Sequence, residues 1–169
     1  MPLNSFLKNM KIIRTFFWTI SLLGTPYFYI PVILYFLKAS PRLAIILAFA
    51  LLFTEIVCAA VKYIYPKERP IPMPNKTFFQ KYRAGSFPSI HTARITTFSI
   101  SIISVYTNKI FILTALLVIS GVGYSRIYLK KHYFIDVICG FIIGAVIGIS
   151  VLSLPYYGAL DYLKLLNLP

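Results

Sequence analysis

The sequence predicts an all-α fold, a polytopic transmembrane helical bundle, and two observations carry this prediction. Hydrophobic residues make up 59% of the 169 residues and charged residues only 12%, so a soluble domain of this size would have to leave much of that apolar surface in water. The apolar residues also gather in continuous runs of about 20, the length that a helix needs to cross a bilayer. Strands of a membrane barrel would alternate in shorter segments, so the runs favour helices.

Five membrane spans are expected, in a single integral-membrane domain that covers residues 1–169. They lie at residues 15–37, 42–64, 89–107, 110–128 and 133–154. Ahead of the first span, Lys8, Lys11 and Arg14 alternate with apolar residues, a pattern typical of a short helix in the headgroup layer. A cleaved signal peptide is the alternative, but no small-residue cleavage site follows the apolar run, so an uncleaved first span is expected.

The link at residues 65–88 is expected to be an extramembrane loop, because all other links between spans are only a few residues long. It is rich in proline, charged and aromatic residues. Its four prolines between residues 66 and 74 preclude a long helix there. Loops of this length in compact proteins are usually either functional or disordered.

The zig-zag of the spans brings four helix ends to one membrane face, namely the ends of the second and fourth spans and the starts of the third and fifth. The charged and polar residues expected at this face are Lys62, Arg69, Ser89, His91, Arg126, His132 and Asp136. Each has an ordinary explanation by itself, because lysines and arginines snorkel at span ends and a lone histidine is more often structural. Their convergence, which includes both histidines of the chain, favours a functional site.

The residue types at this face indicate phosphoryl transfer. His132 and Asp136 are spaced i, i+4, so the carboxylate can hold one imidazole nitrogen and leave the other as a nucleophile or base. His91 supplies a second group that can carry a proton. The cations suit a phosphate dianion, whose oxygens guanidinium groups bind in pairs. Attack of an imidazole on phosphorus, followed by hydrolysis of the phosphohistidine, is the route that these residues allow.

No metal or other cofactor is expected. Magnesium prefers carboxylates, and the acidic residues are dispersed along the chain at Glu55, Glu68, Asp136 and Asp161. Two histidines alone make a poor zinc site. Glu55 and Arg94 lie at membrane depth, where they are expected either to contact each other or to find Ser and Thr partners. Neither of them is expected to be catalytic.

Three segments resemble the three signatures of the type 2 phosphatidic acid phosphatase superfamily. They are "KYIYPKERP" (62–70), "PSIH" (88–91) and "SRIYLKKHYFID" (125–136). The family pattern is K-x6-RP, then PSGH, then SR-x5-H-x3-D, and all spacings match. Isoleucine stands at position 90 where the family usually has glycine, which puts the path of that loop in doubt because glycine lets backbone approach a ligand closely.

The resemblance implies a role for each residue of the signatures. Lys62, Arg69 and Arg126 would bind phosphate oxygens, helped by Ser89 and the backbone N–H of Ile90. His132 would be the nucleophile, oriented by Asp136. His91 would protonate the leaving oxygen and then activate water. Similar members of the family work without a metal. They commonly have six spans. Six spans therefore remain an alternative to five here, with residues 1–14 in the place of the missing N-terminal helix.

The resulting expectation is a metal-independent lipid phosphatase that cleaves a lipid phosphomonoester or pyrophosphate. The compact chain and basic loop are most similar to bacterial lipid A 1-phosphatases. The alternatives are phosphatidylglycerophosphate or undecaprenyl pyrophosphate as substrate, a lipid-to-lipid phosphotransferase, and a non-enzymatic headgroup binder or transporter. Replacing His132 by alanine distinguishes the enzyme from the binder.

The expected partners are the lipid bilayer and a membrane lipid phosphate, with no obligate protein partner inferred. The net charge of +13 would raise nucleic acid as a partner in a soluble protein. Here the cations lie at span ends, where anionic headgroups attract them, and Lys130 and Lys131 are expected to contact such headgroups. The resemblance implies a bacterial inner-membrane protein whose active site faces the periplasm, although a simple count of cations would place that face in the cytoplasm.

Overall fold

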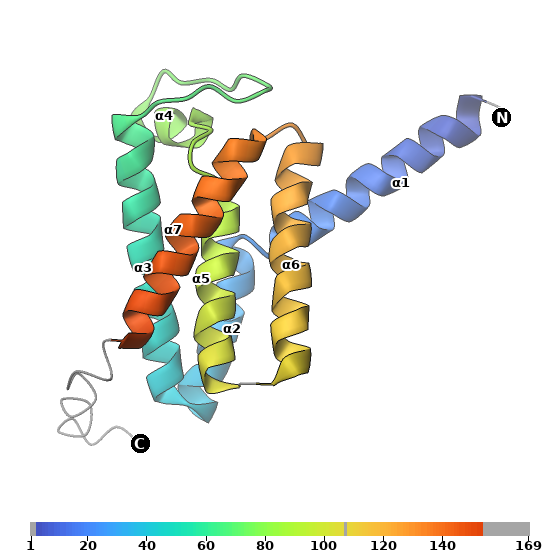
Figure 1. Cartoon of the computed structure of the whole chain (residues 1–169). Coiled ribbons are helices and arrows are strands. Elements are labelled where there is room, and N and C mark those ends of the chain that lie inside the picture. Colours follow the sequence, from blue (N-terminus) through green and yellow to red (C-terminus); the bar gives the residue numbers. More distant parts are fainter. Residues whose placement is uncertain (1–2, 107, 154–169) are drawn as a thin grey trace.

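The structure, a computed structural model, describes residues 3–106 and 108–153, with side chains for residues 7–106 and 108–151. Asp161 and the expected end of the last span at residue 154 lie outside these residues. The described residues form seven helices, so the all-α prediction is confirmed (Figure 1). The helices are α1 (Leu3–Leu22), α2 (Pro26–Ala39), α3 (Pro41–Ile64), α4 (Phe78–Ala84), α5 (Ile90–Val105), α6 (Lys109–Tyr128) and α7 (Phe134–Ser153).

Three helices, α3, α6 and α7, are long and apolar enough to cross a membrane, and a fourth span results if α1 and α2 count as one bent span. The protein is therefore polytopic, with three to four candidate spans rather than five. The expected span at 89–107 corresponds to α5, which has only 16 residues. It runs through the middle of the bundle, against α3, α6 and α7 (Figure 1), and buries hydroxyl-bearing residues such as Thr96, Thr97 and Ser101.

The expected first span, 15–37, is divided between α1 and α2, which meet at an angle of 42°. Pro26 begins α2 and has no N–H with which to continue α1. A side chain at Gly24 would overlap the Cβ atom of His91. The bend thus brings the chain against the first turn of α5. Residues 3–14 are the first part of α1 rather than a separate helix, and Figure 1 shows α1 leaving the bundle.

The packing of α7 against α5 is the most extensive contact between two helices and sets the position of the site. A Cβ atom at Gly140 would collide with the carbonyl oxygen of Ser89, and one at Gly144 with that of Ala93. Small residues allow this close approach of two backbones in a membrane bundle. One turn before Gly140, the carbonyl oxygen of Asp136 accepts the backbone N–H of Ser89 at 2.8 Å. The starts of α5 and α7 are therefore fixed side by side.

Residues 65–88 lie over the end of the bundle where α3 ends and where α5 and α7 begin (Figure 1). The proline-rich part is not helical, as its composition predicts, and α4 follows it. Thr77 and Gln80 form a capping box at the start of α4, because each side chain accepts a hydrogen bond from the other residue's backbone N–H. This segment supplies backbone carbonyl groups to the cations described next.

Candidate active site

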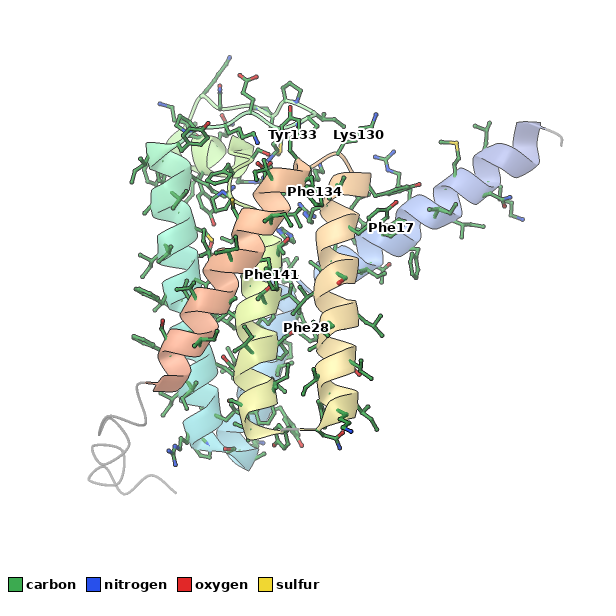
Figure 2. The ribbon with its side chains drawn as sticks, in the orientation of Figure 1. Phe17, Phe28, Lys130, Tyr133, Phe134 and Phe141 are labelled. Carbon is green, nitrogen blue, oxygen red and sulfur yellow. The ribbon has the colours of Figure 1, made fainter. Side chains whose placement is uncertain are left out.

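The expected face exists, and a pocket of about 280 Å³ opens on it. Its lining includes His91 and six cationic side chains, and among the described residues it includes no Asp or Glu. The cations are Lys62, Arg69, Arg83, Arg94, Arg126 and Lys131. Lys130 and Tyr133 mark the α6–α7 turn at this end of the bundle (Figure 2). Helices α3, α5 and α6, the segment 65–88 with α4, and the α6–α7 turn thus contribute to one cationic pocket, whereas no described residue of α7 lines it.

His132 lies in the α6–α7 turn and is only 2% exposed. Its Nδ1 atom is 2.6 Å from the carbonyl oxygen of Ser86. A carbonyl can only accept a hydrogen bond, so Nδ1 carries the proton and Nε2 presents its lone pair. Nε2 has no hydrogen-bond partner among the described residues. The outer nitrogen of the ring is therefore unpartnered but buried, and His132 is not itself among the residues that line the pocket.

The pKa of His132 is lowered to about 4. Burial is the largest cause, and the positive charges of Arg126, Arg69 and Lys62 lower it further, whereas the Asp136 carboxylate opposes them by raising it. Burial disfavours the charged form of an imidazole. The ring is therefore neutral at physiological pH, the state in which a nitrogen can act as a nucleophile.

Asp136 does not hold the imidazole directly, which differs from the expectation. Its Oδ2 atom is 3.8 Å from Nδ1 of His132, beyond hydrogen-bond distance. The carboxylate instead accepts from Lys67 Nζ at 2.7 Å, from the hydroxyl of Ser86, and from the backbone N–H of Tyr133 at 2.8 Å. It therefore reaches His132 through Ser86, whose own carbonyl binds the ring.

Sequence reasoning missed Ser86 and Lys67. Both belong to the loop at 65–88, Ser86 two residues before the "PSIH" segment and Lys67 inside "KYIYPKERP". Ser86 N–H donates to the carbonyl of Lys67 at 2.7 Å, so the two residues are also joined through their backbones. Nothing in the spacing of the signatures singles them out. Only the general expectation of a functional loop pointed to this segment.

Lys62 and Arg69 are held by carbonyl groups at the end of α4. Lys62 Nζ donates to the Gly85 carbonyl at 2.5 Å, and Arg69 donates to the carbonyls of Ala84 and Gly85 at 3.3 and 3.4 Å. A carbonyl orients a cation without neutralising it. Arg126 is similar, because Nη1 donates to the hydroxyl of Ser21 at 2.5 Å and its buried Nε finds no described partner. All three expected phosphate-binding cations are therefore oriented but uncompensated.

His91 and Ile90 form the first turn of α5 and line the pocket. Nδ1 of His91 has no hydrogen-bond partner among the described residues. The first backbone N–H groups of a helix have no acceptor within it, so the start of α5 is a suitable place for an anion.

Ser89, by contrast, does not line the pocket. Its hydroxyl is 2.9 Å from that of Thr92, and its backbone N–H donates to the backbone carbonyl oxygen of Asp136.

Glu55 and Arg94 contact each other, which is one of the two arrangements expected from the sequence. The Arg94 Nε and Nη2 atoms lie 2.8 and 2.5 Å from Oε2 of Glu55, and Nη1 donates to the carbonyl of Gly24 at 3.3 Å. The hydroxyl of Tyr82 donates to the other carboxylate oxygen. Arg94 is thus the one pocket cation that an acid neutralises within the part of the chain that the structure describes.

The sequence of residues 43–158 matches the model of the PAP2 superfamily. Two curated relatives are similar to this chain in sequence. An undecaprenyl-diphosphatase of Sulfolobus acidocaldarius is 28% identical over 77% of this chain and 64% of its own length. A lipid A 4'-phosphatase of Porphyromonas gingivalis is 27% identical over 72% of this chain and 56% of its own length. The chain therefore spans about three fifths of the length of these relatives.

Two crystal structures share the fold. LpxE of Aquifex aeolicus aligns with a TM-score of 0.72 at 23% identity, over 84% of this chain and 86% of its own. A PAP2-type phosphatidylglycerolphosphate phosphatase of Bacillus subtilis aligns with a TM-score of 0.70 at 19% identity, over 86% of this chain and 77% of its own. At these identities the likeness concerns the fold alone.

Proposed function

We propose that this chain, which belongs to the PAP2 superfamily, is a hydrolase that removes a phosphoryl group from a membrane lipid. The single observation that carries the proposal is the imidazole of His132, whose Nδ1 is held by the Ser86 carbonyl and whose Nε2 is unpartnered among the described residues. The cations that lower its pKa include Arg126, Arg69 and Lys62, which line the pocket. A nucleophilic nitrogen beside oriented, uncompensated cations is suited to attack on a phosphate.

In the first step, Nε2 of His132 attacks phosphorus while the bond from phosphorus to the lipid-side oxygen breaks. His91, which enters this step as an imidazolium favoured by the bound phosphate anion, gives a proton to that leaving oxygen and becomes neutral. The phosphorylated ring is cationic, and the Asp136 carboxylate 3.8 Å away stabilises it. The Ser86 carbonyl keeps Nδ1–H in place throughout, so Asp136 acts both by its charge and by holding Ser86.

In the second step, water attacks phosphorus and the bond between phosphorus and Nε2 breaks. His91, deprotonated by the first step, takes the proton from that water. Inorganic phosphate leaves, and the ring returns to its neutral state. Lys62, Arg69 and Arg126 bind the phosphoryl oxygens in both steps, and the backbone N–H of Ile90 adds a hydrogen bond. Ser89 has the smaller role of fixing the start of α5.

The proposed substrate is a lipid phosphate at the bilayer surface, with its tail in lipid and only its headgroup in the pocket. Lipid A 1-phosphate was the first expectation, with phosphatidylglycerophosphate and undecaprenyl pyrophosphate as the others. The names of the two curated relatives, an undecaprenyl-diphosphatase and a lipid A 4'-phosphatase, support this class of substrate.

The test is phosphate release by the purified chain from a panel of these lipids in mixed micelles. The proposal predicts release from at least one of them and none from the His132→Ala variant. Transfer of phosphate to an acceptor lipid would indicate a phosphotransferase instead. Equal lipid binding by both proteins, with no turnover by either, would indicate a headgroup binder and overturn the proposal.

We also propose that the pocket faces the periplasmic side of a bacterial inner membrane. The cations at this face are accounted for by phosphate binding, so they cannot serve as evidence for a cytoplasmic face. A cysteine placed at exposed Asn75 in the loop tests this orientation. Labelling of intact spheroplasts by a membrane-impermeant maleimide is expected, and labelling only after lysis would contradict it.

A further inference from the structure

The pocket carries more positive charge than one phosphate monoester requires. Of its six cations, only Arg94 is paired with an acid among the described residues, namely Glu55. Asp136 is the other acid inside the bundle, and its partner Lys67 does not line this pocket. Five cations therefore remain without a described acid. A phosphomonoester is at most a dianion, and Lys62, Arg69 and Arg126 already suffice for it.

Arg83 and Lys131 are the two cations that the proposed reaction does not use. Arg83 belongs to α4 and Lys131 to the turn between α6 and α7, so they approach the pocket from different elements. Neither makes an ion pair or a side-chain hydrogen bond with a described residue. Arg83 is exposed and Lys131 half-buried, whereas Lys62 and Arg126 are only 4% and 7% exposed. The two spare cations therefore lie at the more exposed end of the pocket.

These side chains repel the other cations of the pocket. The pKa of Lys131 is lowered by burial and then by the charges of Arg69, Arg126 and Arg14. The pKa of Arg69 is lowered by burial and then by Arg83. Like charges held this close weaken one another's charged forms. A second anionic group at the exposed end would relieve the repulsion.

We propose that Arg83 and Lys131 form a second phosphate subsite and that the substrate class is a lipid diphosphate. This inference rests on the proposed function. The terminal phosphoryl group lies at the buried end, against Arg126 and the imidazole of His132, and is the group transferred. The phosphoryl group attached to the lipid lies between Arg83 and Lys131. Their charges also stabilise the lipid monophosphate as it leaves, because the negative charge on that phosphate grows when the bridging bond breaks.

The same cations could instead bind the headgroups of surrounding anionic lipids, as expected for Lys131 from sequence. The substrate and the surrounding headgroups both offer a phosphate, but replacing the two cations would lower the rate under different conditions in the two cases. A subsite for the substrate acts on diphosphates in a neutral micelle. Binding of surrounding headgroups acts on every substrate and only in an anionic bilayer.

The experiment compares farnesyl diphosphate with farnesyl monophosphate, which share one tail, as substrates of the full chain in micelles of a zwitterionic detergent. We expect kcat/KM to be about a hundredfold higher for the diphosphate, since each of the two charge-assisted contacts contributes about tenfold. Arg83→Ala and Lys131→Ala are each expected to lower kcat/KM for the diphosphate by about tenfold. For the monophosphate the loss should stay below about twofold.

Matched controls are available next to each residue. Lys81→Ala changes a cation of the same short helix that lines a different pocket. Lys130→Asn changes the exposed neighbour of Lys131, whose φ of 53° asparagine tolerates. Neither control should alter the preference for the diphosphate. The thermal unfolding of each variant in the same detergent shows that it is folded.

Three results would overturn the inference while leaving the proposed function intact. The first is equal kcat/KM for the two farnesyl substrates, and the second is an equal loss on both from Arg83→Ala or Lys131→Ala. The third is an effect that appears only in vesicles containing anionic phospholipid. If the wild-type chain releases phosphate from neither farnesyl substrate nor any lipid of the panel, the proposed function itself fails.

Discussion

Asp136 and Glu55 make closely similar contacts in two regions of the bundle. Asp136 binds the ammonium of Lys67 and the hydroxyl of Ser86, and Glu55 binds the guanidinium of Arg94 and the hydroxyl of Tyr82. The Asp136 cluster comprises Asp136, Lys67, Ser86 and His132. The Glu55 cluster comprises Glu55, Arg94 and Tyr82.

The two clusters differ in what lies next to the carboxylate. Asp136 has a fully buried side chain and lies 3.8 Å from an imidazole with an unpartnered nitrogen. The Glu55 side chain is 37% exposed, and its cluster joins α3, α4 and α5 without a histidine. In the proposed mechanism, the same carboxylate chemistry therefore acts on turnover in one region and on cohesion of the helices in the other. Changes to the first cluster should act on rate, and changes to the second on stability.

The largest effect is expected from Asp136→Asn. An amide cannot accept hydrogen bonds from Lys67, Ser86 and Tyr133 together, and it removes the charge that stabilises a phosphorylated ring. We expect kcat to fall about a thousandfold, less than the roughly ten-thousandfold loss when the carboxylate bound directly to a catalytic His is replaced, with KM changed less than about threefold. Initial rates over a range of lipid concentrations measure both. A variant with a normal kcat would remove Asp136 from the mechanism.

The next largest effect concerns pH. Because the pKa of His132 is lowered to about 4, the ring is neutral above that value and becomes protonated only as pH falls through it. Single-turnover transfer to the enzyme should therefore persist at pH 5, where an imidazole of ordinary pKa, about 6.5, would be only about 3% neutral. A decline centred near pH 6.5 would contradict the buried, neutral ring. Glu55→Gln should leave this profile unchanged.

Lys67→Met sharpens the comparison within the Asp136 cluster. The variant removes one of three donors to the carboxylate but keeps its charge and its bond to Ser86. Lys67 is 27% exposed, so the pair is worth less than a fully buried one. We expect kcat to fall about tenfold. A loss as large as that of Asp136→Asn would mean that the ammonium itself takes part in the chemistry.

Glu55→Gln should have the opposite character. It leaves the guanidinium of Arg94, which is 11% exposed, without a carboxylate. We expect a loss of about 2 kcal/mol in the free energy of unfolding, less than for a fully buried pair because Glu55 is partly exposed. The kcat of the folded protein should change less than about threefold. Denaturation in detergent measures the free energy of unfolding, and initial rates at low temperature, where the variant stays folded, measure kcat. Tyr82→Phe is the milder control.

The smallest expected effect is none at all. The proposed reaction uses only side chains and backbone groups, so EDTA should leave the rate of phosphate release unchanged. Loss of activity in EDTA that magnesium restores would show that a metal belongs in the scheme. The Asp136 cluster and the pocket cations would then not be sufficient for the chemistry.

The order of the apolar runs was enough to predict which helix ends meet, because spans must alternate between two membrane faces. Lys62, Arg69, His91 and Arg126 line one pocket for that reason. The sequence did not predict that Ser86 would stand between Asp136 and His132. That contact depends on the path of a loop, and loop paths follow from tertiary packing rather than from residue type.

The expected five spans differ from the three to four candidates of the structure at α5, which has only 16 residues although it runs alongside α3, α6 and α7 (Figure 1). Its buried hydroxyl groups, such as that of Thr97, which bonds to the Gly144 carbonyl at 3.1 Å, show its interior position. The bend at Gly24 depends on a close approach to His91, which is distant in sequence.

The most direct test of the account is to trap the phosphorylated enzyme. A rapid alkaline quench of the chain with a lipid phosphate, followed by peptide mass spectrometry, should place the phosphoryl group on His132. Asp136→Asn should accumulate less of this species, Glu55→Gln should accumulate as much as the wild type, and His132→Gln should form none. A phosphoryl group on any other residue, or turnover by His132→Gln, would contradict the assignment of His132 as the nucleophile.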